Sequence, residues 1–143
     1  PIPAAHIRMT ATISEAAEAL KHALTAIPGL RVSDHMVDNP SPPIAMVGID
    51  QVTYHRAFAA GNPEHDFKIT ILVGRDPERI SQDRLNAYLS YDGPGSVRAA
   101  LETDPTLGGV VNACLCQSGG NIGLVSIGDA NYLTVEFTVL VHP

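Results

Sequence analysis

The chain has 143 residues, 45% of them hydrophobic and 17% charged, which is enough for one domain with a buried core. Nine Lys and Arg against fifteen Asp and Glu give a net charge of −6. This charge excludes a protein that grips nucleic acid by neutralising phosphates, although the chain could still surround DNA. The two cysteines exclude a disulfide framework. No apolar run reaches the roughly 18 residues of a membrane span, so we expect no membrane partner.

The first helix is predicted to start at Thr12. Residues 1–8 carry no periodic pattern, and we expect them to form a flexible arm. The Thr12 hydroxyl and the Glu15 carboxylate, three residues apart, predict a capping box. One apolar stripe then follows at helical spacing: Ile13, Ala16, Ala17, Leu20, Leu24 and Ile27. Pro28 and Gly29 are expected to end the helix.

The next part of the chain predicts strands. Residues 30–33, 44–49 and 51–58 are apolar or alternating, and a proline-rich loop spans 38–43. Residues 66–73 alternate clearly, with their odd-numbered apolar side chains on one face. The short Gly, Asn and Pro segment at 59–63 predicts that the strands on either side of it form an antiparallel hairpin.

Two helices are expected in the middle. Asp76 and Pro77 are typical of a helix start, and residues 92–95 (DGPG) would break this helix. Its predicted inner face consists of Ile80, Leu85, Tyr88 and Leu89. Ser96 would cap a third, short helix that ends at Asp104–Pro105 and buries Val97, Ala100 and Leu101.

The remainder predicts more strands, at 109–117, 122–127 and 132–141, with a turn at 118–121. In the last strand, alternate apolar residues from Leu133 to Val141 face one side, and Thr134, Glu136 and Thr138 face the other. Grouped strands and helices indicate a single α+β domain over residues 9–143. We expect a mostly antiparallel sheet with the N-terminal helix and the two central helices on one face.

We find no set of residues that predicts catalysis, a cofactor or a metal ion. Cys114 and Cys116 share a strand face too far apart for an unstrained disulfide, and no second ligand pair accompanies them. His55 and His65 could face each other near Asp66, but polar residues around a loop are a far commoner arrangement.

Basic and aromatic residues do not interleave as in a nucleic-acid stacking platform. Residues 54–58 (YHRAF) are the nearest candidate. Because Tyr and Arg are enriched at interface hot spots, we interpret them as a contact surface for protein.

Residues 88–102 (YLSYDGPGSVRAALE) resemble the middle of tail terminator proteins of long-tailed siphophages, especially those of phages that infect actinobacteria. Residues 108–113 (GGVVNA), the closing strand 132–141 and the order of elements from Met9 onward are similar to the same family. The resemblance therefore covers nearly the whole chain, and only residues 1–8 lie outside it.

The resemblance implies a structural virion protein without enzymatic activity, assembled in the host cytoplasm. It would form a homohexameric ring at the head-proximal end of the tail, stop tube polymerisation, and contact the tail tube protein and the head-closure or neck proteins. DNA would pass through the lumen without specific binding, which an acidic ring favours.

Subunits of this family meet through sheet edges and loops. We therefore predict an interface at the tip of the 54–66 hairpin and on the outer face of the last strand. Its predicted residues are Tyr54, His55, Arg56, Phe58, Tyr132, Thr134, Glu136 and Thr138. Three alternatives stay open: another neck, head-closure or tail-completion protein, a small thiol or hydrolytic enzyme, and a small-ligand binding module. A thiol enzyme using Cys114 or Cys116 predicts rapid alkylation at neutral pH.

Overall fold

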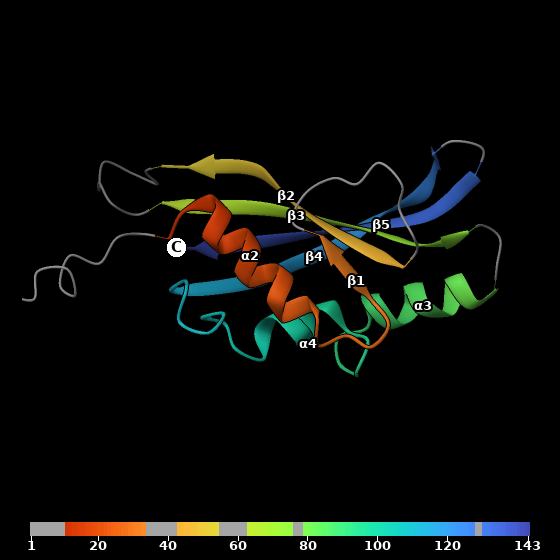
Figure 1. The fold of residues 1–143 in the computed structure, drawn as a ribbon, viewed down its shortest axis with the longest axis horizontal. Coiled ribbons are helices and arrows are strands. Elements are labelled where there is room, and N and C mark those ends of the chain that lie inside the picture. The colour runs from red at the N-terminus through yellow and green to blue at the C-terminus, as the bar shows by residue number, and fades with distance from the viewer. Residues whose placement is uncertain (1–10, 34–42, 55–62, 76–78, 128–129) are drawn as a thin grey trace, which may run out of the picture.

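The fold consists of one five-stranded sheet with helices packed on one of its faces (Figure 1). The computed structural model describes residues 11–33, 43–54, 63–75, 79–127 and 130–143, so the predicted arm at 1–8 lies outside the described residues. The elements are α2 (Ile13–Leu24), β1 (Arg31–Ser33), β2 (Ile44–Thr53), β3 (Glu64–Arg75), α3 (Arg79–Leu89), α4 (Val97–Glu102), β4 (Ala113–Ile127) and β5 (Ala130–His142).

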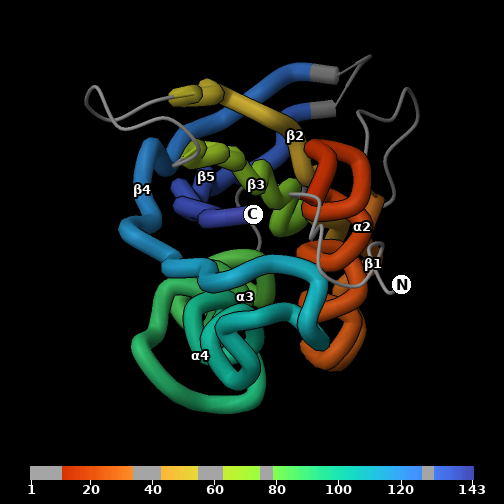
Figure 2. The backbone as a smooth tube through the Cα atoms, turned by 90° about the vertical axis from the view of Figure 1, so that its left-hand side faces the viewer, coloured from red at the N-terminus to blue at the C-terminus, as the bar shows by residue number. Residues whose placement is uncertain are grey.

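The strand order across the sheet is β1-β2-β3-β5-β4. β1 runs parallel to β2, and every other neighbouring pair is antiparallel. Seen nearly along the strands, α2 lies beside β1 and β2 while α3 and α4 lie beneath the sheet (Figure 2). The predicted α+β class, the largely antiparallel sheet and the helices on one face are confirmed.

The predicted capping box of α2 is confirmed. The Thr12 hydroxyl accepts a hydrogen bond from the Glu15 N–H at 3.1 Å, and Glu15 Oε1 accepts one from the Thr12 N–H at 2.9 Å. Most of the predicted stripe is buried, including Leu20 and Leu24. Ile13 is 39% exposed because it lies at the first position of the helix, before the helix passes over the sheet.

The two strands predicted at 44–49 and 51–58 form one strand, β2, over the part that the structure describes. Its register against β3 shifts between Ile49 and Gln51, and this irregularity accounts for the broken alternation in the sequence. The antiparallel pairing of β2 with β3 confirms the predicted hairpin. His55, Arg56 and Phe58 lie outside the described residues.

The predicted inner face of α3 is wrong at Ile80, which is 61% exposed, and right at Leu85 and Tyr88. Ser81 is buried in place of Ile80, giving an inner face at positions 81, 85 and 88. A Cβ at Gly74 would overlap the Ser81 hydroxyl, so the glycine lets α3 approach β3 at this point. Successive helical residues are about 100° apart, and Ile80 therefore points away.

The turn predicted at 118–121 is wrong, because β4 passes through it as a single strand. The register with β5 shifts between Cys116 and Ser118 and again between Gly120 and Gly123. Asn121, which lies between Gly120 and Gly123, has a backbone φ of 52°. The extra residues are thus absorbed as bulges against β5, whose alternation is unbroken. β4 begins at Ala113 and not at 109, because Gly108 and Gly109 have positive φ.

The main core lies between the helices and the sheet. It contains the predicted inward-facing residues of β3 and β5. Among them, four are fully buried: Phe67, Ile69, Val135 and Val139. A smaller apolar cluster of Ile44, Met46, Leu72 and Tyr132 is separate from it. Strand alternation places this smaller cluster on the face opposite the helices.

Candidate protein interaction surface

β4 forms one edge of the sheet and is its longest strand, with β5 as its only strand neighbour among the described residues. Apolar side chains along it are exposed to an unusual degree: Leu115 52%, Ile122 53%, Leu124 60% and Val125 38%. A long, apolar strand edge offers unpaired backbone groups to another strand, and it is usually protected unless it binds a partner. We call residues 118–127 the open edge of β4.

The start of β4 is protected by a side chain from α4. The Cys116 N–H donates to Glu102 Oε2 at 3.0 Å, so a carboxylate takes the place that a neighbouring strand would occupy. Arg98 holds this carboxylate by a 2.9 Å hydrogen bond to Glu102 Oε1. Within the part of the chain that the structure describes, no strand pairs with the same side of the following residues, which form the open edge.

Arg98 also stacks on an exposed aromatic ring. Its guanidinium carbon lies 3.6 Å from the centre of the Tyr91 ring, and its Nε donates to the Tyr91 carbonyl at 2.9 Å. Arg98 Nη2 also donates a hydrogen bond to Asp92 Oδ1 at 3.2 Å. Tyr91 is 70% exposed, so a fixed Tyr–Arg pair of the kind found at interface hot spots lies on the surface of the turn between α3 and α4.

The opposite side of the sheet has a second open strand segment. β1 pairs only with Ile44, Ala45 and Met46 of β2. Residues 47–53 of β2 have no strand neighbour on that side among the described residues. Tyr54, directly after the end of β2, is 71% exposed, so this predicted interface residue is accessible.

The predicted interface residues of β5 lie on the face opposite the helices. Thr134, Glu136 and Thr138 are half-buried there. Lys68 bridges Asp50 and Glu136 at 3.8 Å each, and Asn121 Nδ2 donates to Glu136 Oε1 at 2.6 Å. This part of the face is polar and internally paired. Tyr132, in contrast, is 8% exposed and belongs to the smaller apolar cluster.

The two thiols lack the features of a nucleophile. Cys114 is buried, with its sulfur 3.5 Å from the Leu101 carbonyl, and Cys116 is partly buried. Burial, followed by the negative charge of Glu102, raises the pKa of both thiols to about 11. Because the thiolate is the reactive form, neither group is activated at neutral pH.

His65 is buried at the end of the sheet, and its predicted partner His55 lies outside the described residues. Its Nδ1 has no hydrogen-bond partner, and burial lowers its pKa. Its ring meets the Phe67 ring edge-on at 6.2 Å. Nearby, His142 Nε2 lies 3.5 Å from Glu64 Oε2. Over the described ranges, no three His, Cys, Asp or Glu side chains gather as a metal site would require.

None of the described helices has the length and apolar character to cross a membrane. The chain matches no protein-family model and no curated protein sequence. The sequence pattern predicted Tyr54 as an interface residue, and this residue is exposed. The pattern did not predict the open edge of β4, because it indicated a turn at 118–121 within what is one continuous strand. The apolar residues Ile122, Leu124 and Val125 indicate a strand, but the sequence carries no signal that this strand lies at an edge of the sheet.

Proposed function

We propose that the chain is a phage tail terminator: a structural virion protein that forms a homohexameric ring at the head-proximal end of the tail tube. The ring stops tube polymerisation and joins the tail to the head-closure or neck proteins. The observation that carries this proposal is the pair of open strand segments, in β4 and β2, on opposite sides of one sheet.

The topology lets the sheet continue from one copy to the next. β2, β3, β5 and β4 alternate in direction, so β4 of one copy and β2 of an identically oriented neighbour would run antiparallel. Such a contact joins two different surfaces of the same protein. Repeated contacts of this kind close into a ring when the rotation between copies closes.

The two open segments lie at different levels along the strands. Val47 of β2 is level with Ile69, Phe137 and Gly119 through the strand register, so residues 47–53 lie level with the protected start of β4. Neighbouring copies would therefore pair with an offset along the strand direction. An offset of this kind is required when a sheet closes on itself with tilted strands.

The surface chemistry agrees with a passage for DNA. The chain carries a net charge of −6, and repulsion between an acidic wall and phosphates favours sliding over binding. The fixed Tyr91–Arg98 pair and the open edge of β4 indicate a surface for protein contacts. The raised pKa of both thiols speaks against the thiol enzyme alternative.

The test is tube capping. Tail tube protein is polymerised with and without the chain, and tube lengths and ends are measured by electron microscopy. We expect shorter tubes, each with one ring-shaped cap. Tubes of unchanged length with bare ends would contradict the proposal, and binding to head-closure protein alone would identify a neck protein instead.

A further inference from the structure

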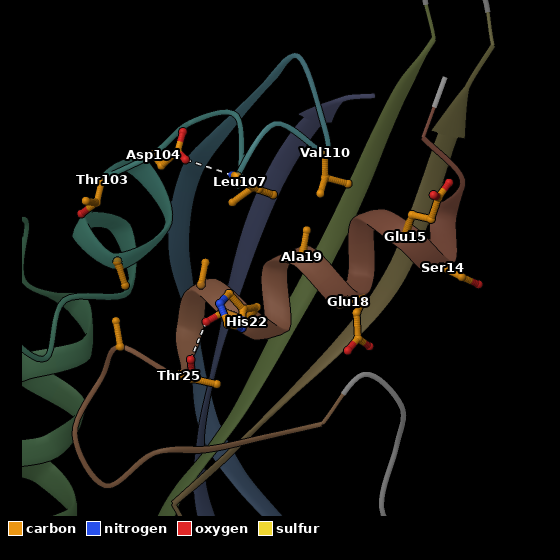
Figure 3. A pocket seen from close by; sticks show the side chains of 14 residues that line it. Ser14, Glu15, Glu18, Ala19, His22, Thr25, Thr103, Asp104, Leu107 and Val110 are labelled. Carbon is orange, nitrogen blue, oxygen red and sulfur yellow. Dashed lines mark hydrogen bonds between the residues drawn. The ribbon is translucent and has the colours of Figure 1, made fainter. Parts of the chain in front are cut away.

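A groove lies in the helical layer between α2 and the segment that follows α4 (Figure 3). Its volume is about 990 Å³, and none of the described strand residues lines it. Leu107 and Val110 face Ala19 across the groove (Figure 3). The apolar lining consists of Ala19, Ala23, Ala26, Ala100, Leu107 and Val110.

The groove exists because one wall has small side chains and the other wall is held away from it. Ala19, Ala23 and Ala26 follow each other at helical spacing, so this face of α2 and the turn after it fills little space. The Asp104 carboxylate accepts hydrogen bonds from the Thr106 N–H at 3.1 Å and the Gly108 N–H at 2.9 Å. These bonds fix the opposite wall in place.

The charged residues that line the groove are acidic. Glu15 and Glu18 come from α2 and Asp104 from the opposite wall. Among the described residues, His22 is the only other titratable side chain in the lining, and no Lys or Arg lines the groove. Hydrogen bonds from Thr12 lower the pKa of Glu15, and those from Thr106 and Gly108 lower the pKa of Asp104. An apolar floor between carboxylates therefore selects a cationic, amphipathic partner.

We propose that this groove binds an amphipathic helix of a second protein, with small apolar residues facing the alanines and Lys or Arg at its sides. α2 has 12 residues, about 18 Å of helix, so the groove offers length for roughly three turns of a partner helix. A helix that lays its apolar face in a groove is a recurrent recognition mode.

A second copy of the chain is a poor occupant. Each copy carries a net charge of −6, and Arg79 and Arg84 on the exposed side of α3 have Asp83 beside them. Nucleic acid is disfavoured by the same carboxylates. The inference rests on the proposed function for one point only, that the partner is a neighbouring protein of the tail or neck.

The experiment measures binding of a synthetic 14-residue helical peptide made of Leu, Ala and Lys, using fluorescence anisotropy with the full chain. A peptide with Glu in place of Lys and a peptide of scrambled order serve as ligand controls. We expect the Lys peptide alone to bind, and its affinity to fall with added salt.

Two variants alter the groove at exposed positions, and each has a matched control on α3. Glu18→Lys reverses a charge, with Asp83→Lys as its control, and Ala26→Phe fills the floor, with Gln82→Phe as its control. We expect each groove variant to weaken binding roughly tenfold or more, and the controls to bind like the original chain.

Two results would overturn the inference: absence of binding by the Lys peptide, or equal binding by groove and control variants. Either could occur in a chain that forms rings and caps tubes, in which case the proposed function stands. Conversely, selective peptide binding by a chain that never caps tubes would contradict the proposed function alone.

Discussion

At the residue scale, Gly119 shows how one missing side chain permits the sheet and the helices to pack. A Cβ at this position would lie 2.6 Å from the Phe137 ring and 2.9 Å from Leu89 Cδ2. Phe137 is a core residue of β5, and Leu89 packs against that core from the end of α3. The glycine thus lets the edge strand cross a buried contact between a strand and a helix.

Gly119→Ala is therefore expected to lower the free energy of unfolding by about 1–3 kcal/mol through overpacking. Gly120→Ala is the matched control, since a Cβ there has nothing within 4 Å. Chemical denaturation of both variants measures the difference. Equal stability of the two would show that the Phe137 contact does not constrain β4.

His65 predicts a pH dependence of stability. Burial lowers the pKa of His65 below its ordinary value of 6.5 in the folded chain, so the unfolded chain takes up the proton first. The neutral His65 makes its full contribution to the free energy of unfolding at pH values well above 6.5. As the pH drops below 6.5, protonation of this side chain in the unfolded chain lowers the free energy of unfolding. His65→Gln should reduce this dependence in denaturation curves at pH 5 to 7, and a dependence equal to that of the original chain would contradict the role given to His65.

At the element scale, α2 depends on its cap and β4 on its partner strand. The capping box satisfies backbone N–H groups that the first turn of α2 cannot pair internally. Thr12→Ala should lower the free energy of unfolding by about 1 kcal/mol. Ser14→Ala, at an exposed position in the same turn, is the control, and an equal loss in both would exclude the cap as the cause.

The open edge of β4 can be tested with two residues of equal exposure. Leu124 is 60% exposed on the open edge, and Ile80 is 61% exposed on α3. A lysine on a strand edge blocks pairing with another strand. We expect Leu124→Lys to remain folded but to lose self-association, measured by sedimentation velocity, and Ile80→Lys to associate normally. Normal association of Leu124→Lys together with loss of association of Ile80→Lys would show that copies contact each other through α3 instead.

The elements differ in how much of their structure is determined by their own sequence. α2, α4 and β5 were predictable because caps and periodicity act within each segment. The orientation of Ile80 was predicted wrongly because the rotation of α3 depends on Gly74, which lies six residues before Ile80 in another element, β3. β4 was divided because its glycines are typical of a turn, and only the unbroken partner strand β5 keeps such a segment extended.

At the scale of the whole molecule, the helices cover one face of the sheet, and among the described residues no further strand pairs with the outer side of β4 or with residues 47–53 of β2. Under the proposed function, the open segments on opposite sides of the sheet make the repeated contacts between copies. The open edge of β4 became visible only in three dimensions, since an edge is defined by which strand lacks a neighbour. In the proposed ring, copies pair through the strand edges of the sheet. The acidic groove between α2 and the segment after α4 remains accessible to another protein.

The most direct test is native mass determination across a concentration series, with electron-microscopy averages of the largest species. The proposed ring predicts a species of six times 15.1 kDa, or roughly 91 kDa, with six-fold symmetry and an open centre. Leu124→Lys should abolish it. A chain that stays at 15.1 kDa at every concentration, also in the presence of tail tubes, would contradict the ring.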